Sequence, residues 1–506
     1  EGERAVWQYW HVHAEAKRQL RTTGLRPDQL EPAADWLTTT ALERHAVAIE
    51  PRDMGIGEPD ELRRADGSSV YSVAGAKLYT SRRIVEAEQR IVAAAGRSDG
   101  RRLPVEAVDL ALLESVAYGP TLNAGQAVMV RAMATSGARV QLGIAPAGSG
   151  KTTAMATLAR AWRESGGTVV GLSPAAAAAA QLRSQIETHT DTLAKLVWSI
   201  EHHDLPTWAS SIDQKTLVII DEAGTADTLS LDVAINFVLK RGGSVRLIGD
   251  DQQLGAIAAG GVLRDIAAHH GAVHLNELLR FADAAEGNAS LALRDGRPEA
   301  LGFYLDNGRV HIGDLDGLTR TVFDSWKADR AEGRDAIMLA PTRELVAQLN
   351  EKARAHRLDG RRSGREVTLA DGNSASAGDT IITRLNNRRL RVSRTDWVKN
   401  GDRWTVLKVA SNGRLTAQHN THRRVVTLPA DYVAESTELG YATTVHGAQG
   451  VTADAMHGLA TGSESRQQLY TMVTRGRTAN HIYLANVGDG DPHSLVDPDT
   501  VIPPTP

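Results

Sequence analysis

The stretch that decides the fold has at its centre the residues Ala145-Pro146-Ala147-Gly148-Ser149-Gly150-Lys151-Thr152-Thr153. It directly follows the apolar run Val140–Ile144. A helix is predicted after it, because one apolar face is formed by Met155, Leu158, Ala159 and Trp162. A glycine-rich turn between a strand and a helix is the context that a phosphate-binding loop requires. We therefore predict a P-loop at residues 145–153.

The residue types in this loop fit phosphate binding. Gly148 and Gly150 remove side-chain bulk, so that backbone N–H groups can point inward at the start of the helix. Lys151 can reach the terminal phosphates, and Thr152 can offer its hydroxyl to Mg²⁺. Ala145 replaces the usual first glycine, which is a mild departure because the later glycines make the close approach. We expect ATP and Mg²⁺ as cofactors. The nucleotide contacts expected in the loop are Pro146, Ala147, Gly148, Ser149, Gly150, Lys151, Thr152 and Thr153.

A second motif follows after one intervening strand. The apolar run Leu217–Ile220 ends in Asp221 and Glu222. Ligands bind at the carboxyl ends of the strands in open α/β sheets, so both carboxylates are expected at the ligand edge. Asp221 could hold Mg²⁺ together with Thr152, and Glu222 could activate the attacking water. Alone, an Asp-Glu pair after a strand is ordinary surface chemistry, but downstream of a P-loop it predicts an ATPase.

Composition excludes several other classes of protein. A length of 506 residues suggests roughly three or four domains. With 57 Lys and Arg against 61 Asp and Glu, the net charge of -4 excludes a uniformly basic nucleic-acid binder but permits local basic patches. The absence of cysteine excludes disulfides and cysteine nucleophiles, and it fits a reducing compartment.

The ends and the hydropathy of the chain lead to further expectations. No apolar run approaches the roughly 20 residues needed to cross a bilayer, so we expect no membrane insertion and a cytoplasmic location. The chain starts with Glu1-Gly2-Glu3-Arg4, without an initiator methionine or a leader, so we expect a piece of a longer protein.

From residue 140 onward, short apolar runs alternate with helical patterns. This alternation predicts an α/β fold whose parallel sheets are covered on both faces. The predicted strands are Val140–Ile144, Thr168–Leu172, Leu217–Ile220, Val245–Ile248, Ala336–Leu339 and Ile482–Leu484. Between about residues 352 and 432 the rhythm breaks into short alternating segments with turn signals such as Asn400-Gly401. That stretch predicts a small antiparallel β insert.

Residues 1 to about 118 read as a self-contained, mainly helical region. Ser81 is expected to cap a helix. One buried helical face is expected to contain Trp7, Trp10, Ala14 and Leu20. The predicted domains are a helical domain at 1–118, a first lobe at 119–275, a second lobe at 276–351 and 433–490, the β-rich insert at 352–432 and a linker at 491–506.

Several segments far from the P-loop indicate the kind of ATPase. In Gly249-Asp250-Asp251-Gln252-Gln253-Leu254, which follows a predicted strand, a glutamine could sense the γ-phosphate. Arg280 and Arg475 suit a second lobe that closes over ATP and neutralises charge in the transition state. Taken individually, such arginines are more often exposed. The order and completeness of the set favour function.

This ordered series resembles the superfamily 1 helicases. It is most similar to their 5′→3′ branch, which contains the exonuclease subunit RecD and the helicase part of conjugative relaxases of the MobF type, particularly actinobacterial ones. The resemblance implies two RecA-like lobes with parallel sheets and a small SH3-like insert in the second lobe. It implies that Gln253, Arg280 and Arg475 contact the γ-phosphate, and that Gln126, in Leu122-Asn123-Ala124-Gly125-Gln126, reads adenine.

The same resemblance implies where DNA binds. Ser173, Pro174 and Thr190 fall in elements that touch DNA. The segment from Tyr441 to Thr452 is the element that joins DNA binding to closure over ATP; Thr444 and His446 are expected on DNA and Gly450 beside the nucleotide. The partners expected are single-stranded DNA, junctions between single-stranded and duplex DNA, an upstream DNA-nicking relaxase domain and the conjugation machinery.

The insert is rich in arginine, which predicts a basic groove along DNA phosphates, with Arg384 and Asn386 among its contacts. The arginines concerned, with Lys352, are Arg354, Arg357, Arg361, Arg362, Arg365, Arg384, Arg388, Arg389, Arg391 and Arg394. Solvated arginines on a soluble module are the alternative. Base stacking is expected to rest on few side chains, with Trp397, Trp404 and Tyr441 as candidates.

Two other functions stay open. One is a DNA-repair helicase of the RecD kind, and the other is an ATP-regulated module that binds single-stranded DNA without unwinding. RNA as the substrate is a weaker alternative. The pairs His11/His13 and His419/His422 lack further ligands at convincing spacing, so we do not expect them to bind metal.

Overall fold

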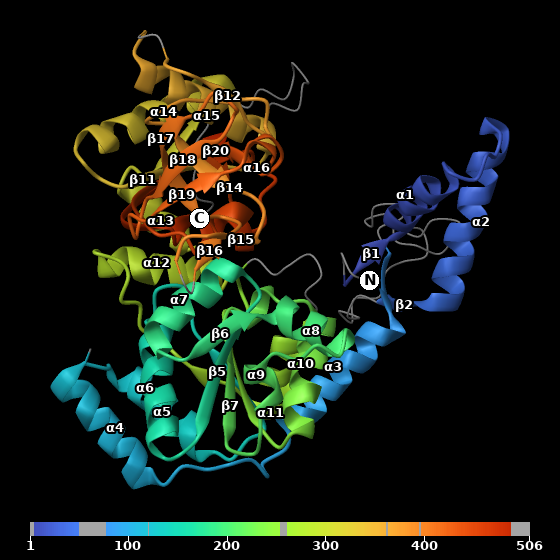
Figure 1. Cartoon of the computed structure of the whole chain (residues 1–506), viewed down its shortest axis with the longest axis vertical. Coiled ribbons are helices and arrows are strands. Elements are labelled where there is room, and N and C mark those ends of the chain that lie inside the picture. Colours follow the sequence, from blue (N-terminus) through green and yellow to red (C-terminus); the bar gives the residue numbers. More distant parts are fainter. Residues whose placement is uncertain are drawn as a thin grey trace, which may run out of the picture.

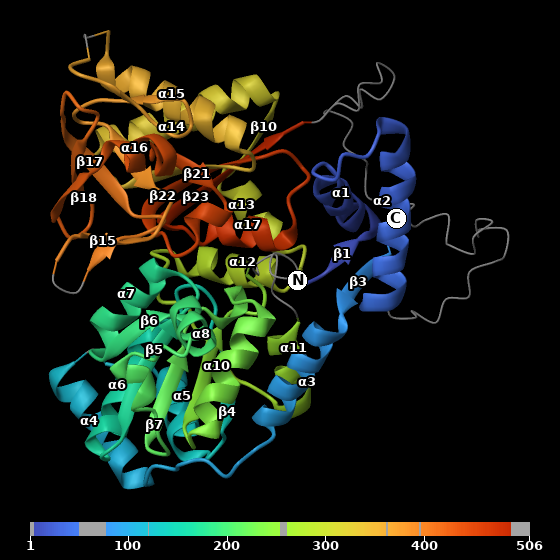
Figure 2. The ribbon, with the colours of Figure 1, turned by 45° about the vertical axis from the view of Figure 1, so that its right-hand side comes forward.

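The computed structural model describes residues 5–49, 77–119, 121–253, 261–360, 363–393 and 396–486. Two α/β lobes lie one above the other, and a helical arm at the N-terminus projects to one side (Figures 1 and 2). Arg361, Arg362, Arg394 and the expected linker at 491–506 lie outside the described residues. None of the helices described is long and apolar enough to cross a membrane.

The first lobe is built on a parallel sheet of six strands in the order β6-β5-β7-β8-β4-β9. Alternate residues of its strands enter two different cores, because Val218 and Ile220 pack on one face of the sheet and Leu217 and Ile219 on the other. The strands are β4 (Val140–Ile144), β5 (Thr168–Ser173), β6 (His189–Thr192), β7 (Thr216–Ile220), β8 (Ser244–Gly249) and β9 (Val273–His274). The helices are α5 (Ala124–Thr135), α6 (Lys151–Glu164), α7 (Ala176–Ile186), α8 (Leu193–Glu201), α9 (Thr207–Ser210), α10 (Thr228–Lys240) and α11 (Val262–His270).

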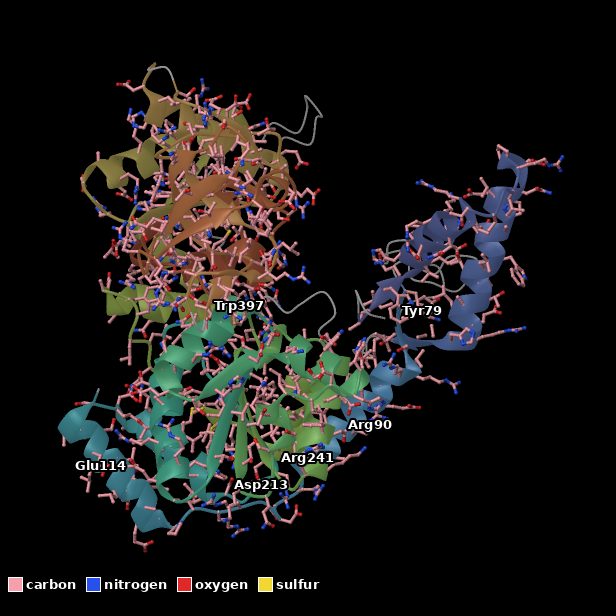
Figure 3. The ribbon with its side chains drawn as sticks, viewed as in Figure 1. Tyr79, Arg90, Glu114, Asp213, Arg241 and Trp397 are labelled. Atoms are coloured by element: carbon pink, nitrogen blue, oxygen red, sulfur yellow. The ribbon has the colours of Figure 1, made fainter. Side chains whose placement is uncertain are left out.

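The N-terminal elements divide between the arm and the first lobe. In the arm, a three-stranded antiparallel sheet joins β1 (Trp7–Gln8), β2 (Ala46–Ile49) and β3 (Leu78–Ser81) beside α1 (Tyr9–Leu20) and α2 (Pro27–His45). Helices α3 (Arg82–Ala95) and α4 (Val105–Tyr118) instead pack on the first lobe and contribute Ile91 and Val108 to its cores. Figure 3 shows Arg90 on α3, where it pairs with Asp232 of α10 at 2.7 Å. The expected boundary at residue 118 therefore follows two helices that share the core of the lobe.

Two expectations for this region have different outcomes. The cap at Ser81 is confirmed, since its hydroxyl accepts the N–H of Ile84 at 3.2 Å. The buried face proposed for the first helix is only partly confirmed: Leu20 is buried, but Trp10 is 59% exposed and Ala14 is also exposed. The other residue that helix α1 buries is His13. A helix that packs against a single neighbour buries only a narrow stripe, which the sequence spacing did not locate.

The second lobe repeats the architecture of the first. Its parallel sheet has five strands in the order β10-β23-β22-β11-β21. The strands are β10 (Val310–Gly313), β11 (Ala336–Ala340), β21 (Ala442–Thr444), β22 (Ala453–Ala460) and β23 (Gly476–Ala485). The helices are α12 (Ala284–Arg294), α13 (Ala300–Asp306), α14 (Leu315–Ala331), α15 (Arg343–Leu358) and α17 (Arg466–Val473). The predicted α/β class with parallel sheets is confirmed.

The insert is a small β module, as predicted. Its main sheet is antiparallel in the order β19-β18-β17-β14-β20 and continues past residue 432 to Leu439. The strands are β14 (Thr380–Thr383), β17 (Arg403–Val409), β18 (Leu415–His419), β19 (Val425–Leu428) and β20 (Thr437–Leu439), with helix α16 (Ala430–Ser436). Two separate pairs are β12 (Val367–Thr368) with β13 (Ser374–Ala375), and β15 (Asn387–Arg391) with β16 (Trp397–Val398).

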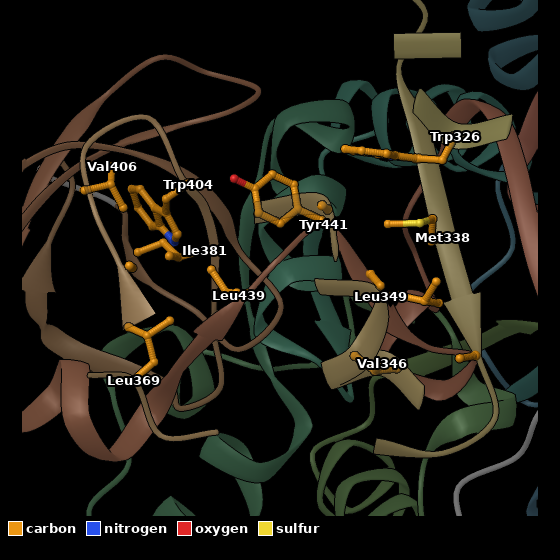
Figure 4. Close-up of a cluster of buried hydrophobic side chains, with 14 of the residues drawn as sticks. Trp326, Met338, Val346, Leu349, Leu369, Ile381, Trp404, Val406, Leu439 and Tyr441 are labelled. Atoms are coloured by element: carbon orange, nitrogen blue, oxygen red, sulfur yellow. The ribbon is translucent and has the colours of Figure 1, made fainter. Parts of the chain in front are cut away.

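The insert and the second lobe share one hydrophobic core (Figure 4). Trp404 and Leu439 from the insert belong to the same cluster as Trp326 and Met338 from the lobe. Trp404 is completely buried and Tyr441 is 7% exposed, with its phenol donating to Asp379 at 2.8 Å. Proposing these two rings as base-stacking platforms was therefore wrong, because their faces are covered by protein.

Candidate active site between the two lobes

The predicted P-loop connects the C-terminal end of β4 to the start of α6, so both predicted neighbours are confirmed. Gly148 and Gly150 have backbone φ values of +87° and +72°, which residues other than glycine rarely adopt. Space is also restricted. A Cβ at Gly148 would lie 2.5 Å from Cβ of Arg280, and one at Gly150 would lie 2.3 Å from Nε2 of Gln126. The loop therefore needs both glycines for its backbone and for its neighbours.

Lys151 begins α6 and pairs with the two carboxylates at the end of β7. Its Nζ lies 3.4 Å from Oδ1 of Asp221 and forms a shorter ion pair with Glu222. Burial by itself would lower the pKa of Lys151, but the two carboxylates outweigh it and raise that pKa. Glu222 has a φ of +55°, a strained conformation for a residue with a side chain, which aims it back at the loop.

The two carboxylates differ in their environments. Burial raises the pKa of Asp221 above its ordinary value. Burial acts in the same direction on Glu222, but Lys151 and then the more distant Arg475 and Arg280 lower its pKa. Neighbouring carboxylates whose pKa values are pushed apart are suited to different roles in one reaction. The lowered pKa of Glu222 favours its carboxylate form, which is the form that a base requires, whereas burial disfavours the carboxylate form of Asp221.

Two arginines of the second lobe complete the charged cluster. Arg475 is 3% exposed, and burial lowers its pKa to about 10. Its guanidinium donates to the Thr471 carbonyl at 2.8 Å and to the Thr474 hydroxyl at 2.8 Å. Arg280 donates to the Thr474 carbonyl at 2.8 Å, and burial lowers its pKa as well. Within the described residues neither arginine forms an ion pair, so both are placed to meet an incoming anion.

Of the other predicted nucleotide contacts, Gln126 lies against the P-loop and is already engaged within the protein. Gln126 is buried; its Nε2 donates to the Gly150 carbonyl at 3.0 Å, and its Oε1 accepts the N–H of Asn123 at 2.9 Å. The Gln126 side chain therefore supports the backbone of the P-loop. Recognition of adenine by Gln126 stays a prediction. Gly450 is exposed with φ +77°. Gln253 is half-buried, and the adjacent Gln252 is the residue that accepts from Arg466 of the second lobe at 2.8 Å.

Three residues that sequence reasoning did not single out hold the lobes together. Tyr470 on α17 donates to Asp250 at 2.8 Å, and Arg294 at the end of α12 donates to the same carboxylate at 3.0 Å. Asp250 stands within the quoted motif Gly249–Leu254, and Tyr470 lies five positions before the predicted Arg475, so the sequence held a signal for both. Arg294 ends an ordinary helix, and only the packing of the lobes reveals its contact.

The predicted DNA-binding residues lie at strand ends or on the insert. Ser173 is completely buried at the end of β5, and Thr190 is completely buried within β6, where it donates to the Ala179 carbonyl at 2.7 Å. Pro174 follows Ser173 and is half-buried. His446 is exposed, and the Thr444 hydroxyl accepts the N–H of Gly447 at 3.1 Å.

On the insert, several predicted groove residues are tied to acidic partners. Arg384 pairs with Glu438 at 2.6 Å, and the side-chain Oδ1 of Asn386 accepts the N–H of Asn400 at 3.0 Å. Arg354 and Arg357 point inward to the buried Asp379, at 3.2 and 2.6 Å. For Arg354 and Arg357 the predicted role in a groove along DNA phosphates was wrong, and so was the alternative of solvated side chains. Their guanidinium groups compensate a buried carboxylate. No metal-binding cluster of His, Cys, Asp or Glu is found among the residues described.

Two protein families match parts of this chain. Residues 121–315 match the AAA domain family, and residues 367–438 match the Rv2311 SH3-like barrel domain family. The first match includes the first lobe with its P-loop and is a similarity to that family. The second match confirms the predicted SH3-like character of the insert.

More particularly, the chain is similar to conjugal transfer proteins named TraA. It is 31% identical over 352 residues to the probable conjugal transfer protein TraA of Sinorhizobium fredii, and 31% identical over 357 residues to the TraA of Agrobacterium fabrum. Each alignment covers 68% of this chain, which spans about a third (31%) of the length of either relative. The predicted resemblance to conjugative transfer proteins is confirmed; its RecD-like and actinobacterial details stay predictions.

Other similarities cover the insert or the general fold. A stretch of 97 residues is 35% identical to the uncharacterized protein Rv2311 of Mycobacterium tuberculosis, and covers 19% of this chain and 56% of that protein. Among solved structures, the Pif1 helicase from Candida albicans superposes with a TM-score of 0.48 and 15% identity, over 72% of this chain and 94% of that one. A Bacteroides Pif1 complex with ADP-AlF3 and ssDNA gives 0.46 and 16%, over 69% and 89%.

Proposed function

We propose that this chain is an ATP-dependent DNA helicase that moves along single-stranded DNA. The observation that carries the proposal is the convergence of two lobes on one phosphate-binding loop. Lys151, Asp221 and Glu222 come from the first lobe, and Arg280 and Arg475 reach the same cluster from the second. Cations on a second lobe can neutralise charge that develops on a transferred phosphoryl group, and their movement couples hydrolysis to motion of the lobe.

The residues present fit MgATP. Lys151 would hold the phosphates, and Thr152 with Asp221 would hold Mg²⁺, which would neutralise charge on the phosphates. The carboxylates that now engage Lys151 are the groups that a metal and a water would require, so exchange of partners costs no unpaired charge. Glu222 would orient the attacking water. Gln253, Arg280 and Arg475 are proposed to detect the γ-phosphate, and Gln126 and Gly450 to lie near the nucleotide.

The nucleic-acid side of the proposal rests on the motif series and on the relatives. We propose single-stranded DNA and its junctions with duplex DNA as the substrate, with Ser173, Pro174, Thr190, Arg384, Asn386, Thr444 and His446 among the contacts. Because the TraA relatives are conjugal transfer proteins, we propose that the motor unwinds plasmid DNA during transfer beside a DNA-nicking domain. The 5′→3′ direction is proposed from the resemblance, and a cytoplasmic location follows from the substrate.

The test is steady-state ATP hydrolysis with and without single-stranded DNA. We expect strong stimulation by DNA, and we expect Lys151→Ala to lower the turnover number by at least about a hundredfold, because the terminal phosphates lose their cation. Lys240→Ala is the matched control, since Lys240 is exposed at the end of α10 on the same lobe. Unwinding of duplexes with a 5′ or a 3′ tail then determines the direction. Tight DNA binding without turnover would contradict the motor and favour an ATP-regulated binding module.

A further inference from the structure

One side chain of the second lobe reaches two elements of the first. Tyr470 lies on α17 and is completely buried. Its hydroxyl donates to Oδ2 of Asp250, which directly follows β8, at 2.8 Å. The same hydroxyl accepts the backbone N–H of Ala147, inside the P-loop, at 3.3 Å.

The partners of Tyr470 are fixed on the side of the first lobe. Asp250 is 4% exposed, and its Oδ1 accepts from Nε of Arg294 at 3.0 Å and from the N–H of Gln252 at 3.1 Å. The phenol is therefore the donor that serves Oδ2. Burial, with the nearby Asp250, raises the pKa of Tyr470 well above its ordinary value, so the hydroxyl remains protonated and can donate at any working pH.

Tyr470 is also linked to Arg475 through the end of its own helix. The Thr474 hydroxyl donates to the Tyr470 carbonyl at 3.0 Å and accepts from Nη2 of Arg475 at 2.8 Å. Nε of Arg475 donates to the Thr471 carbonyl at 2.8 Å. A shift of Tyr470 relative to the P-loop therefore moves the guanidinium of Arg475 relative to Glu222.

We propose that Tyr470 is a positioning residue that ties the second lobe to the P-loop and thereby places Arg475 at the phosphate site. The backbone amide of Ala147 belongs to the phosphate-binding loop, where backbone N–H groups are the donors available to a phosphate. A phosphate bound in the loop would compete with the Tyr470 hydroxyl for the N–H of Ala147. Phosphate binding and the position of α17 are therefore coupled. This inference rests on the proposed function and adds the residue that transmits nucleotide binding between the lobes.

The sharpest test compares two tyrosine variants that each remove one oxygen. Tyr470→Phe keeps the ring but leaves Asp250 and Ala147 without this partner. Tyr304→Phe is the matched control, because Tyr304 lies in the same lobe, is also completely buried, and has a hydroxyl without a hydrogen-bond partner among the described residues. Lost placement of Arg475 affects the transition state more than the ground state. We therefore expect Tyr470→Phe to lower kcat for ATP about tenfold with KM within about twofold of the parent, and Tyr304→Phe to change neither.

A second measurement does not depend on turnover. Hydrogen exchange is followed in peptides covering the P-loop and residues 466–475, with and without AMP-PNP and Mg²⁺. We expect the nucleotide to protect the P-loop in the parent and in both variants. Residues 466–475 should respond to it in the parent and in Tyr304→Phe, but not in Tyr470→Phe.

The outcomes separate the inference from the proposed function. If the parent hydrolyses ATP with DNA stimulation but Tyr470→Phe matches it in kcat and in the response of residues 466–475, the inference is wrong and the motor stands. If the parent protects its P-loop yet shows no turnover, the motor is wrong, and the response of residues 466–475 still decides the role of Tyr470. If AMP-PNP protects nothing in the parent, both are wrong.

Discussion

The charges at the P-loop illustrate how single residues depend on each other in a buried site. Lys151 is held between Asp221 and Glu222, and each of the three would be costly to bury alone. Under the proposed function, an exchange of these partners for phosphate and metal would keep every charge compensated. The strained backbone of Glu222 is consistent with a residue whose position matters for chemistry.

A second group of titratable residues predicts how stability depends on pH. His481 on β23 stacks near His311 and His457, with ring centroids 5.6 and 5.4 Å away. Burial, and then the neighbouring cations, lower the pKa of His481 to about 4. Between about pH 4 and 6.5 the unfolded chain therefore binds more protons than the folded chain, so acidification through this window destabilises the fold. From pH 7 to pH 5 we expect a loss on the order of 1 kcal/mol from this residue.

Thermal unfolding at pH 7 and at pH 5 measures this effect. We expect the melting temperature of the parent to fall by a few degrees more than that of His481→Gln, which cannot take up the proton. His274→Gln serves as the control, since His274 is exposed on β9. Equal falls in the parent and in His481→Gln would contradict the assignment.

Among the elements, the hairpin of β15 and β16 brings the insert into contact with the first lobe. Arg388 on β15 forms two hydrogen bonds to the carboxylate of Asp191 on β6. Its guanidinium also lies over the ring of Trp397, 4.4 Å from the ring centroid. Figure 3 shows Trp397 where the insert meets the first lobe. The guanidinium of Arg388 thus covers a face of the Trp397 ring that a base would need for stacking. Asp191 also competes with any DNA phosphate for binding to Arg388.

We expect Asp191→Asn to bind single-stranded DNA about threefold more tightly than the parent, because Arg388 becomes available to a phosphate while a weak, partly exposed ion pair is lost. The asparagine keeps the oxygen that accepts the N–H of Thr192 at 2.7 Å. Fluorescence anisotropy at several salt concentrations measures the affinity and its salt dependence. Asp204→Asn, an exposed site on the same lobe, should leave both unchanged. An Asp191→Asn variant with the affinity of the parent would exclude this competition.

At the scale of the chain, the insert is not an independent attachment. Its residues and those of the second lobe form one continuous core (Figure 4). Asn350 of α15 strengthens the connection by donating to the Leu439 carbonyl at 3.1 Å and accepting the N–H of Ala442 at 2.8 Å. We therefore expect the second lobe and its insert to unfold as one cooperative unit.

Leu415→Ala, at a fully buried position on β18, tests whether the second lobe and the insert unfold together. We expect it to cost about 2–5 kcal/mol in unfolding free energy and to speed hydrogen exchange in α14 and β11 as well as in the insert. Leu231→Ala, at a fully buried position on α10, should leave exchange in the second lobe unchanged. Faster exchange confined to residues 367–438 would show that the insert unfolds alone.

Much of the fold could be predicted because its signals are local. The apolar run before the P-loop, its two glycines and the helical spacing after Lys151 all lie within about twenty residues. The same holds for the strand that ends in Asp221. The turn residues of the insert predicted an antiparallel module, because turn signals also depend only on residues that are neighbours along the chain.

The failures concern contacts between distant segments. Trp404 and Tyr441 looked like exposed stacking rings, but they belong to a core shared with α14 and β11. Arg354 and Arg357 looked like groove residues, but the buried Asp379 lies 22 or more positions away along the chain and takes their charge. The sequence shows which side chains carry charge or apolar surface, and does not show what lies opposite them.

The sequence by itself therefore determined the P-loop, the carboxylates after β7, the α/β class and the place of the insert, because backbone geometry and periodicity are set by neighbours along the chain. Only the tertiary structure decided that Tyr470 and Arg294 meet Asp250, that Arg388 meets Asp191, and that the insert shares its core with the second lobe. Such pairings depend on burial and on the balance between desolvation and partner charges. Both are properties of the packed molecule and not of any short stretch of it.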